Sequence, residues 1–153
     1  MTLLATLLLA GTLAVAAGPA SAASTWTNAA QVPGMGSINL GQASSAVEVA
    51  CVSGGSCLTG GFYLDGSLHK QGWVASRTAA GWGQAEEVPG LGALNTGSTA
   101  QVADVACSSA GNCVAVGSYT ATGEHAFAAV QTRGHWADAR EVPGVAALEA
   151  TGG

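Results

Sequence analysis

The sequence predicts an all-β protein built from repeats, and three observations carry this prediction. Trp26, Trp82 and Trp136 lie 56 and 54 residues apart, and each is followed six residues later by Val-Pro-Gly. The loop CVSGGSC at 51–57 returns as CSSAGNC at 107–113. The segments between these landmarks are rich in Val and aromatic residues, and none of them shows the 3.6-residue apolar period of a helix.

Each complete unit contains four short predicted strands. In the first unit, apolar segments with many β-branched or aromatic residues are separated by turn signals such as Asp65-Gly66. Pro89 ends the last of them, because proline has no amide hydrogen to donate to a neighbouring strand. The four strands are predicted at 46–52 (AVEVACV), 57–64 (CLTGGFYL), 72–78 (GWVASRT) and 82–88 (WGQAEEV).

Four short antiparallel strands in about 55 residues are typical of a propeller blade. A solenoid usually has shorter turns, and an immunoglobulin-like sandwich needs about seven strands in ~100 residues. We therefore expect β-propeller-like repeats of four-stranded antiparallel blades. The expected organisation is a signal peptide at 1–22, a leading partial repeat and connection at 23–45, blade 1 at 46–88, a connecting loop at 89–101, blade 2 at 102–142, and the start of a truncated third connection at 143–153.

The predicted propeller is incomplete. A closed ring has about four to eight blades, whereas the sequence holds two complete units and stops within the next connection. We expect a truncated chain, and the alternative is a chain that closes its ring by self-association. Two isolated blades would expose apolar faces and aggregate. A further interpretation is therefore that the chain is a non-functional fragment of a longer repeat protein.

The N-terminal segment predicts export. Residues 1–22 contain an uncharged apolar run from Leu3 to Ala17, a Gly-Pro break and an Ala-Ser-Ala site, which together indicate a secretory signal peptide cleaved after Ala22. A transmembrane anchor needs roughly 20 apolar residues, more than this run provides. No Lys or Arg precedes the run, which departs from the usual pattern and leaves the true start open.

The repeat resembles that of secreted actinobacterial β-propeller-like proteins, whose unit reads V-x-C-x-S-x-G-x-C-x-x-x-G-x-Y, then F/W, G-x-W and V-P-G. The first unit departs from it at Gly55-Ser56 and carries Trp73 in place of Phe. The resemblance covers residues 25–153 and implies a propeller fold and export, but no particular activity. The second unit matches at Val105, Cys107, Ser109, Gly111, Cys113, Gly117, Tyr119, Phe127, Gly134, Trp136 and Val142-Pro143-Gly144.

The four cysteines predict two disulfides, Cys51–Cys57 and Cys107–Cys113. Each pair joins the end of one predicted strand to the start of the next through a flexible five-residue loop. Structural zinc favours closer C-x(2–4)-C pairs brought together, whereas these pairs lie at equivalent places in different blades. In an exported protein a disulfide is the default, so metal and free thiols are the lesser alternatives.

Two acids, Glu48 and Asp104, occupy equivalent places in the first strand of each unit. If that strand lines a central channel, they are candidates for binding a cation or a sugar hydroxyl. They could also serve as the two carboxyls of a glycoside hydrolase, which stand about 5 to 10 Å apart. The alternative, which the pattern favours, is that each accepts hydrogen bonds from turn amides of the next blade.

Other candidates carry weaker signals. Leu91, Leu94 and Asn95 lie in the Gly-rich connection and are candidate ligand contacts at a rim. The histidines show no metal spacing and are expected to be solvated loop residues, and no G-x-S-x-G elbow marks a nucleophile. The repeated tryptophans, with Trp73 and its counterpart Phe127, are expected between blades. The histidines are His69, His125 and His135.

Composition limits the classes of partner. The formal net charge is −5 and only 8% of residues are charged, which argues against nucleic acid and, after signal cleavage, against membranes. No motif calls for a cofactor. The sequence therefore predicts a secreted, non-enzymatic binding or scaffold module, whose ligand is an extracellular polysaccharide, cell-wall material or a protein. The alternative is an extracellular hydrolase on the same scaffold, acting through Glu48 and Asp104.

Overall fold

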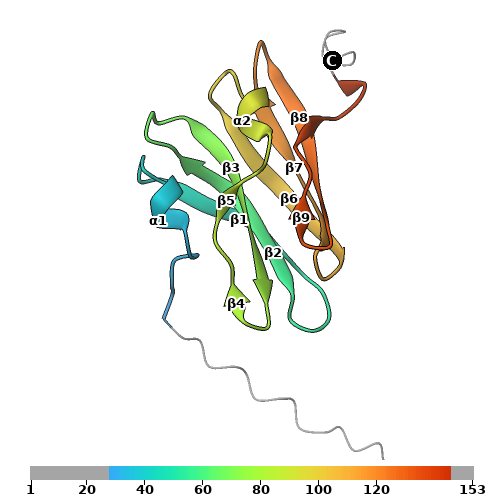
Figure 1. The fold of residues 1–153 in the computed structure, drawn as a ribbon. Helices are drawn as coiled ribbons and strands as arrows, with labels where there is room; N and C mark the ends of the chain where they lie inside the picture. The colour runs from blue at the N-terminus through green and yellow to red at the C-terminus, as the bar shows by residue number, and fades with distance from the viewer. Residues whose placement is uncertain (1–27, 146–153) are drawn as a thin grey trace, which may run out of the picture.

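A computed structural model describes residues 28–145 as two antiparallel sheets, one for each complete repeat (Figure 1). The prediction of an all-β protein is therefore confirmed. The predicted signal peptide and most of the final connection lie outside the described residues. The first sheet contains β1 (Ser44–Cys51), β2 (Cys57–Leu64), β3 (Lys70–Thr78), β4 (Gly81–Trp82) and β5 (Glu86–Glu87), and the second contains β6 (Ala100–Ser109), β7 (Asn112–Thr120), β8 (Glu124–Thr132), β9 (His135–Trp136) and β10 (Arg140–Glu141).

Three of the four strands predicted in the first unit agree closely with the structure, and the fourth differs. The bounds of β2 match the prediction, while β1 and β3 each begin two residues earlier. The fourth strand is interrupted between β4 and β5, because the amide of Ala85 leaves the sheet and donates to the carbonyl of Pro33 at 2.6 Å. The second repeat has the same interruption, with Ala139 donating to Pro89 at 2.7 Å.

Two single-turn helices, α1 (Met35–Ile38) and α2 (Leu91–Leu94), lie in the connections and were missed by the sequence analysis. Each begins after a glycine with a left-handed φ, 79° at Gly34 and 74° at Gly90. Four residues are too few to display a helical period, which explains the miss. Figure 1 shows α2 at one end of the two sheets.

The three residues of the connection proposed as ligand contacts contribute to the packing of the fold. Leu91 is fully buried, and Asn95 is buried and donates through Nδ2 to the carbonyl of Lys70 at 3.1 Å and to Gln71 Oε1 at 2.9 Å. Leu94 is half-buried against the same core. These residues join α2 to β3, so they are structural rather than candidate ligand contacts.

The two sheets pack face to face, with β6 lying against β1, β2 and β3. Their shared core includes Leu58 and Val74 of the first sheet and Val102 and Phe127 of the second, all fully buried. Gly60 makes this close approach possible, because a Cβ there would lie 2.8 Å from Cγ1 of Val102. Within residues 28–145 neither sheet closes on itself and no ring is formed, so the propeller stays a prediction.

A second cluster covers the β2 and β3 part of the opposite face of the first sheet and contains Trp73, which is almost fully buried. Its indole Nε1 donates to the carbonyl oxygens of Ser45 at 3.1 Å and Phe62 at 3.0 Å. The repeated Trp82 and Trp136 are half-buried, and each packs against one of the two cores. Trp26 lies outside the described residues.

Candidate functional site

The predicted disulfides Cys51–Cys57 and Cys107–Cys113 are present. Each joins directly paired residues of adjacent antiparallel strands, with a Cα–Cα distance of 4.0 Å. Their surroundings differ, because Cys113 is buried in the core between the sheets whereas Cys51 is exposed. Both bridges lie at the same end of their sheets and restrain the loops there.

We expect the two disulfides to contribute unequally to stability. Replacing Cys51 and Cys57 by serine should lower the free energy of unfolding by about 2 kcal/mol, the loop-closure value for a short loop. The same change at Cys107 and Cys113 should cost a further ~1–2 kcal/mol, because it buries a serine hydroxyl in an apolar core. Urea denaturation of both double variants checks this, and a smaller loss at Cys107 and Cys113 would contradict it.

A cleft of about 410 Å³ opens between the sheets at the disulfide end. One wall comes from the first sheet and its loops, including Arg77 and Glu86, and the other from the second sheet, including Gln131. Parts of both disulfides also line it, which gives the cleft covalently restrained walls. The remaining polar side chains in the lining are Ser56, Ser76, Thr78, Gln84 and Ser109.

The cleft carries two ionisable side chains of opposite sign among its lining residues, Arg77 and Glu86. The guanidinium of Arg77 donates from Nη1 to the carbonyl of Gly55 at 2.7 Å, which holds it against the disulfide loop. Partial burial raises the pKa of the Glu86 carboxyl above its ordinary value. Gln131 is buried and donates to Ser76 Oγ at 3.2 Å, so this hydrogen bond crosses from one sheet to the other.

The predicted acids Glu48 and Asp104 lie at the same register of β1 and β6, each immediately after a bulge. Both are exposed, and neither lines the cleft. Glu48 Oε1 accepts a hydrogen bond from the amide of Val49 at 3.2 Å, a contact within its own strand. The structure thus confirms their equivalence but gives them no shared pocket among the described residues.

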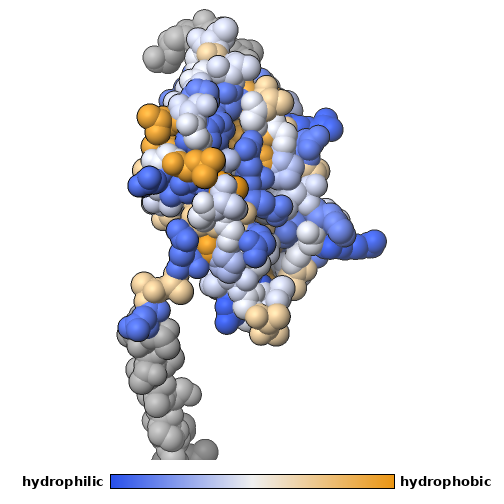
Figure 2. Space-filling model, turned by 60° about the vertical axis from the view of Figure 1, so that its left-hand side comes forward, coloured by the Kyte–Doolittle hydropathy of each residue, from blue (hydrophilic) through white to orange (hydrophobic). Residues whose placement is uncertain are grey.

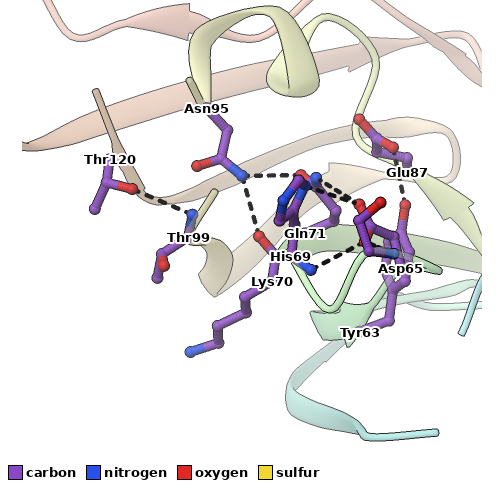
Figure 3. A network of polar contacts seen from close by, with 10 residues as sticks. Tyr63, Asp65, His69, Lys70, Gln71, Glu87, Asn95, Thr99 and Thr120 are labelled. Carbon is purple, nitrogen blue, oxygen red and sulfur yellow. Dashed lines mark hydrogen bonds and ion pairs between the residues drawn. The ribbon is translucent and has the colours of Figure 1, made fainter. Parts of the chain in front are cut away.

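A network of polar contacts organises the β2–β3 loop, at the end of the first sheet opposite the disulfide (Figure 3). Asp65 Oδ1 accepts from the amides of Ser67 at 2.8 Å and His69 at 2.9 Å, while Oδ2 accepts from Gln71 Nε2 at 3.2 Å. Although desolvation opposes them, these hydrogen bonds hold the pKa of Asp65 below its ordinary value. The network therefore fixes a loop rather than forming a reactive site.

Tyrosines of the repeat anchor the interrupted fourth strand. The hydroxyl of Tyr63 donates to Glu87 Oε2 at 2.9 Å (Figure 3), and that of Tyr119 donates to Glu141 Oε2 at 3.1 Å. Burial, followed by this hydrogen bond to the carboxylate, raises the pKa of Tyr63. Equivalent bonds in both repeats indicate a structural role.

The histidines are only partly where the sequence analysis placed them. His69 lies in the exposed loop, with its Nδ1 3.6 Å from Asp65 Oδ2, and His135 is exposed at the start of β9. His125 is instead a half-buried residue of β8, stacked on Tyr119 with ring centroids 5.3 Å apart. The shorter hairpin of the second repeat lets the strand begin before His125, which the prediction of a loop residue did not allow for.

Within the part of the chain that the structure describes, no three His, Cys, Asp or Glu side chains are grouped closely enough to hold a metal ion. In the same residues, no helix has the length and apolar character needed to cross a membrane. The cleft is the candidate site, because it brings ionisable and hydrogen-bonding side chains of both repeats together. No protein-family model, curated protein or solved structure matches the chain.

Proposed function

We propose that the protein is a secreted, non-enzymatic binding module of β-propeller type, whose cleft between repeats takes a neutral segment of an extracellular polysaccharide. The cleft itself is the observation that carries this proposal. Its volume of about 410 Å³ falls within the range of small-ligand sites. Its amide and hydroxyl groups suit a ligand rich in hydroxyls, and Arg77 and Glu86 carry formal charges of opposite sign.

The chemistry of the lining favours binding over hydrolysis. Glycoside hydrolysis uses two carboxyls on either side of the scissile bond, and Glu86 is the one carboxyl among the residues that line the cleft. Export is supported by the two disulfides, because such bonds persist mainly in oxidising compartments. The face-to-face packing of two repeat sheets supports the propeller arrangement.

The proposal is tested by screening the purified protein on an array of neutral oligosaccharides and measuring the best binder by calorimetry. We expect Gln84→Ala and Glu86→Gln to weaken binding at least about tenfold each, because each loses a hydrogen bond to the ligand. Arg140→Ala is the matched control, since Arg140 is the exposed counterpart of Glu86 in the second repeat and does not line the cleft.

Absence of glycan binding, or binding that none of the cleft variants changes, would reject the proposed site. The bound oligosaccharide should also be recovered intact after long incubation. Release of shorter products would instead favour the hydrolase, and the double variant Glu48→Gln, Asp104→Asn should then abolish turnover while leaving the circular dichroism spectrum unchanged.

A further inference from the structure

The packing of the two repeats defines two kinds of sheet face. In the second sheet, the face that meets the first sheet carries Ala100, Val102 and Val105 of β6, and all three are buried. We call this face of any repeat its leading face. Because the repeats are equivalent, the first sheet has a leading face as well, and it points away from the second sheet.

The opposite face of each repeat is its trailing face. In the first sheet it carries Leu58, Gly60 and Val74, all of them buried under the second sheet. The internal joint of the molecule is thus a trailing face of one repeat against a leading face of the next. The leading face of the first sheet and the trailing face of the second sheet take no part in this joint.

The remaining leading face is uncovered along β1. Val49 is 52% exposed, whereas its counterpart Val105 in the joint is 5% exposed. Ala46 is exposed, whereas its counterpart Val102 is fully buried. Figure 2, which brings the α1 side of the molecule forward, shows exposed hydrophobic side chains between polar ones on this side.

The remaining trailing face is apolar and uncovered as well. Val130 is 51% exposed and Val116 is 36% exposed, on β8 and β7 of the second sheet. Val114 and Ala128 are half-buried there, whereas their counterparts Leu58 and Val74 in the joint are fully buried. The molecule therefore presents two complementary halves of an interface that it already forms once internally.

We propose that the uncovered trailing face of one copy binds the uncovered leading face of a second copy, repeating the internal joint between chains. The sizes of the facing residues support this pairing. In the joint, Gly60 lies against Val102. At the equivalent place between copies, Val116 would lie against Ala46. The valine is then on the trailing face and the small residue on the leading face, the reverse of the internal joint, so the summed side-chain volume stays nearly the same.

The connection residues support the same geometry. Asn95 ties the joint together by donating to Lys70 and Gln71 of the preceding sheet. Its counterpart Asn39 donates through Nδ2 to the exposed Ser44 Oγ at 3.3 Å, where solvent or a neighbouring backbone can compete for it. In the second copy, Asn39 would take the role that Asn95 has in the joint.

Association requires the connection that follows β10 in the first copy to be displaced. Val145, Leu91 and Met35 hold equivalent places, since each donates its amide to the valine carbonyl three residues before it. Val145 of the first copy and Met35 of the second would therefore compete for one position at the new joint. Residues 143–145 follow β10, the final strand of the described residues, so they would move aside and α1 of the second copy would replace them.

A trailing-to-leading contact is head-to-tail, so it either closes into a ring or continues as an open chain. Native mass spectrometry and light scattering of the full exported protein test it. We expect assemblies that become monomers in Val49→Lys and in Val130→Lys. Val47→Lys is the matched control, because Val47 is 51% exposed but its counterpart Ala103 stays exposed in the joint.

Mixing the two variants gives the sharpest result. Val49→Lys keeps a working trailing face and Val130→Lys keeps a working leading face, so the mixture should form a dimer of one chain of each and stop there. The two substitutions lie at exposed positions, and unchanged thermal melting of each variant will show that both fold. A wild-type monomer up to the solubility limit, assembly that survives both variants, or failure of the mixture to dimerise would overturn the proposal.

Discussion

Gly117→Ala should prevent folding or lower the free energy of unfolding by at least about 3 kcal/mol, at the upper end of overpacking effects. A Cβ at Gly117 would overlap the carbonyl oxygen of Gln101 on β6 and approach Cε1 of Phe127 to 2.9 Å. The backbone of β6 has little freedom to retreat, because β6 is packed against β1, β2 and β3 of the first sheet. Urea denaturation followed by tryptophan fluorescence measures the loss.

The control for this prediction is Gly123→Ala in the β7–β8 turn. Gly123 has no positive φ, and the nearest atom to a Cβ there is His125 Nε2 at 3.9 Å. We expect a change within about 0.5 kcal/mol, as for most surface substitutions. Equal losses in the two variants would show that the close strand approach at Gly117 is unimportant.

Trp73→Ala should lower the free energy of unfolding by about 4 kcal/mol, because it empties a large volume in the second core. Trp73→Phe should cost only ~1–2 kcal/mol, since the second repeat already carries Phe127 at this place and the main loss is the hydrogen bonding of Nε1. Trp82→Ala, at a half-buried position, should fall between them.

Chemical denaturation of the three variants tests the ranking. If Trp73→Phe were as destabilising as Trp73→Ala, the hydrogen bonds to Ser45 and Phe62 would matter more than the packing of the ring. In that case the equivalence of Trp73 and Phe127 would be one of position only.

The repeat could be predicted from the sequence because its strongest constraints are local. Cys51 and Cys57 are paired across one hairpin, and the bounds of β2 follow from its run of apolar and aromatic residues. The interruption of the fourth strand could not be predicted, because it depends on a hydrogen bond from Ala85 to Pro33, some fifty residues away. The four-residue helices could not be predicted either, because they are too short to show the 3.6-residue apolar period of a helix.

The cleft could not be predicted for a related reason. Arg77 and Gln131 belong to different repeats, and they share the cleft only because the two sheets pack face to face. Neither residue belongs to the repeated pattern, since Arg77 in the first unit corresponds to Gln131 in the second. By contrast, Glu48 and Asp104 stood out in the sequence because they are equivalent, although the structure leaves both on exposed strands.

The hydrogen bonds from Ala85 to Pro33 and from Ala139 to Pro89 have a consequence for folding and evolution. Each bond joins the end of a repeat to the connection that enters the same repeat, so each of the two described repeats is closed by a contact of its own. Such a segment can act as a foldon, whose opening and closing in hydrogen exchange is cooperative within the repeat and coupled only to its neighbours. Tandem duplication of one segment would then add a repeat to the array without breaking the corresponding backbone hydrogen bond in any other repeat.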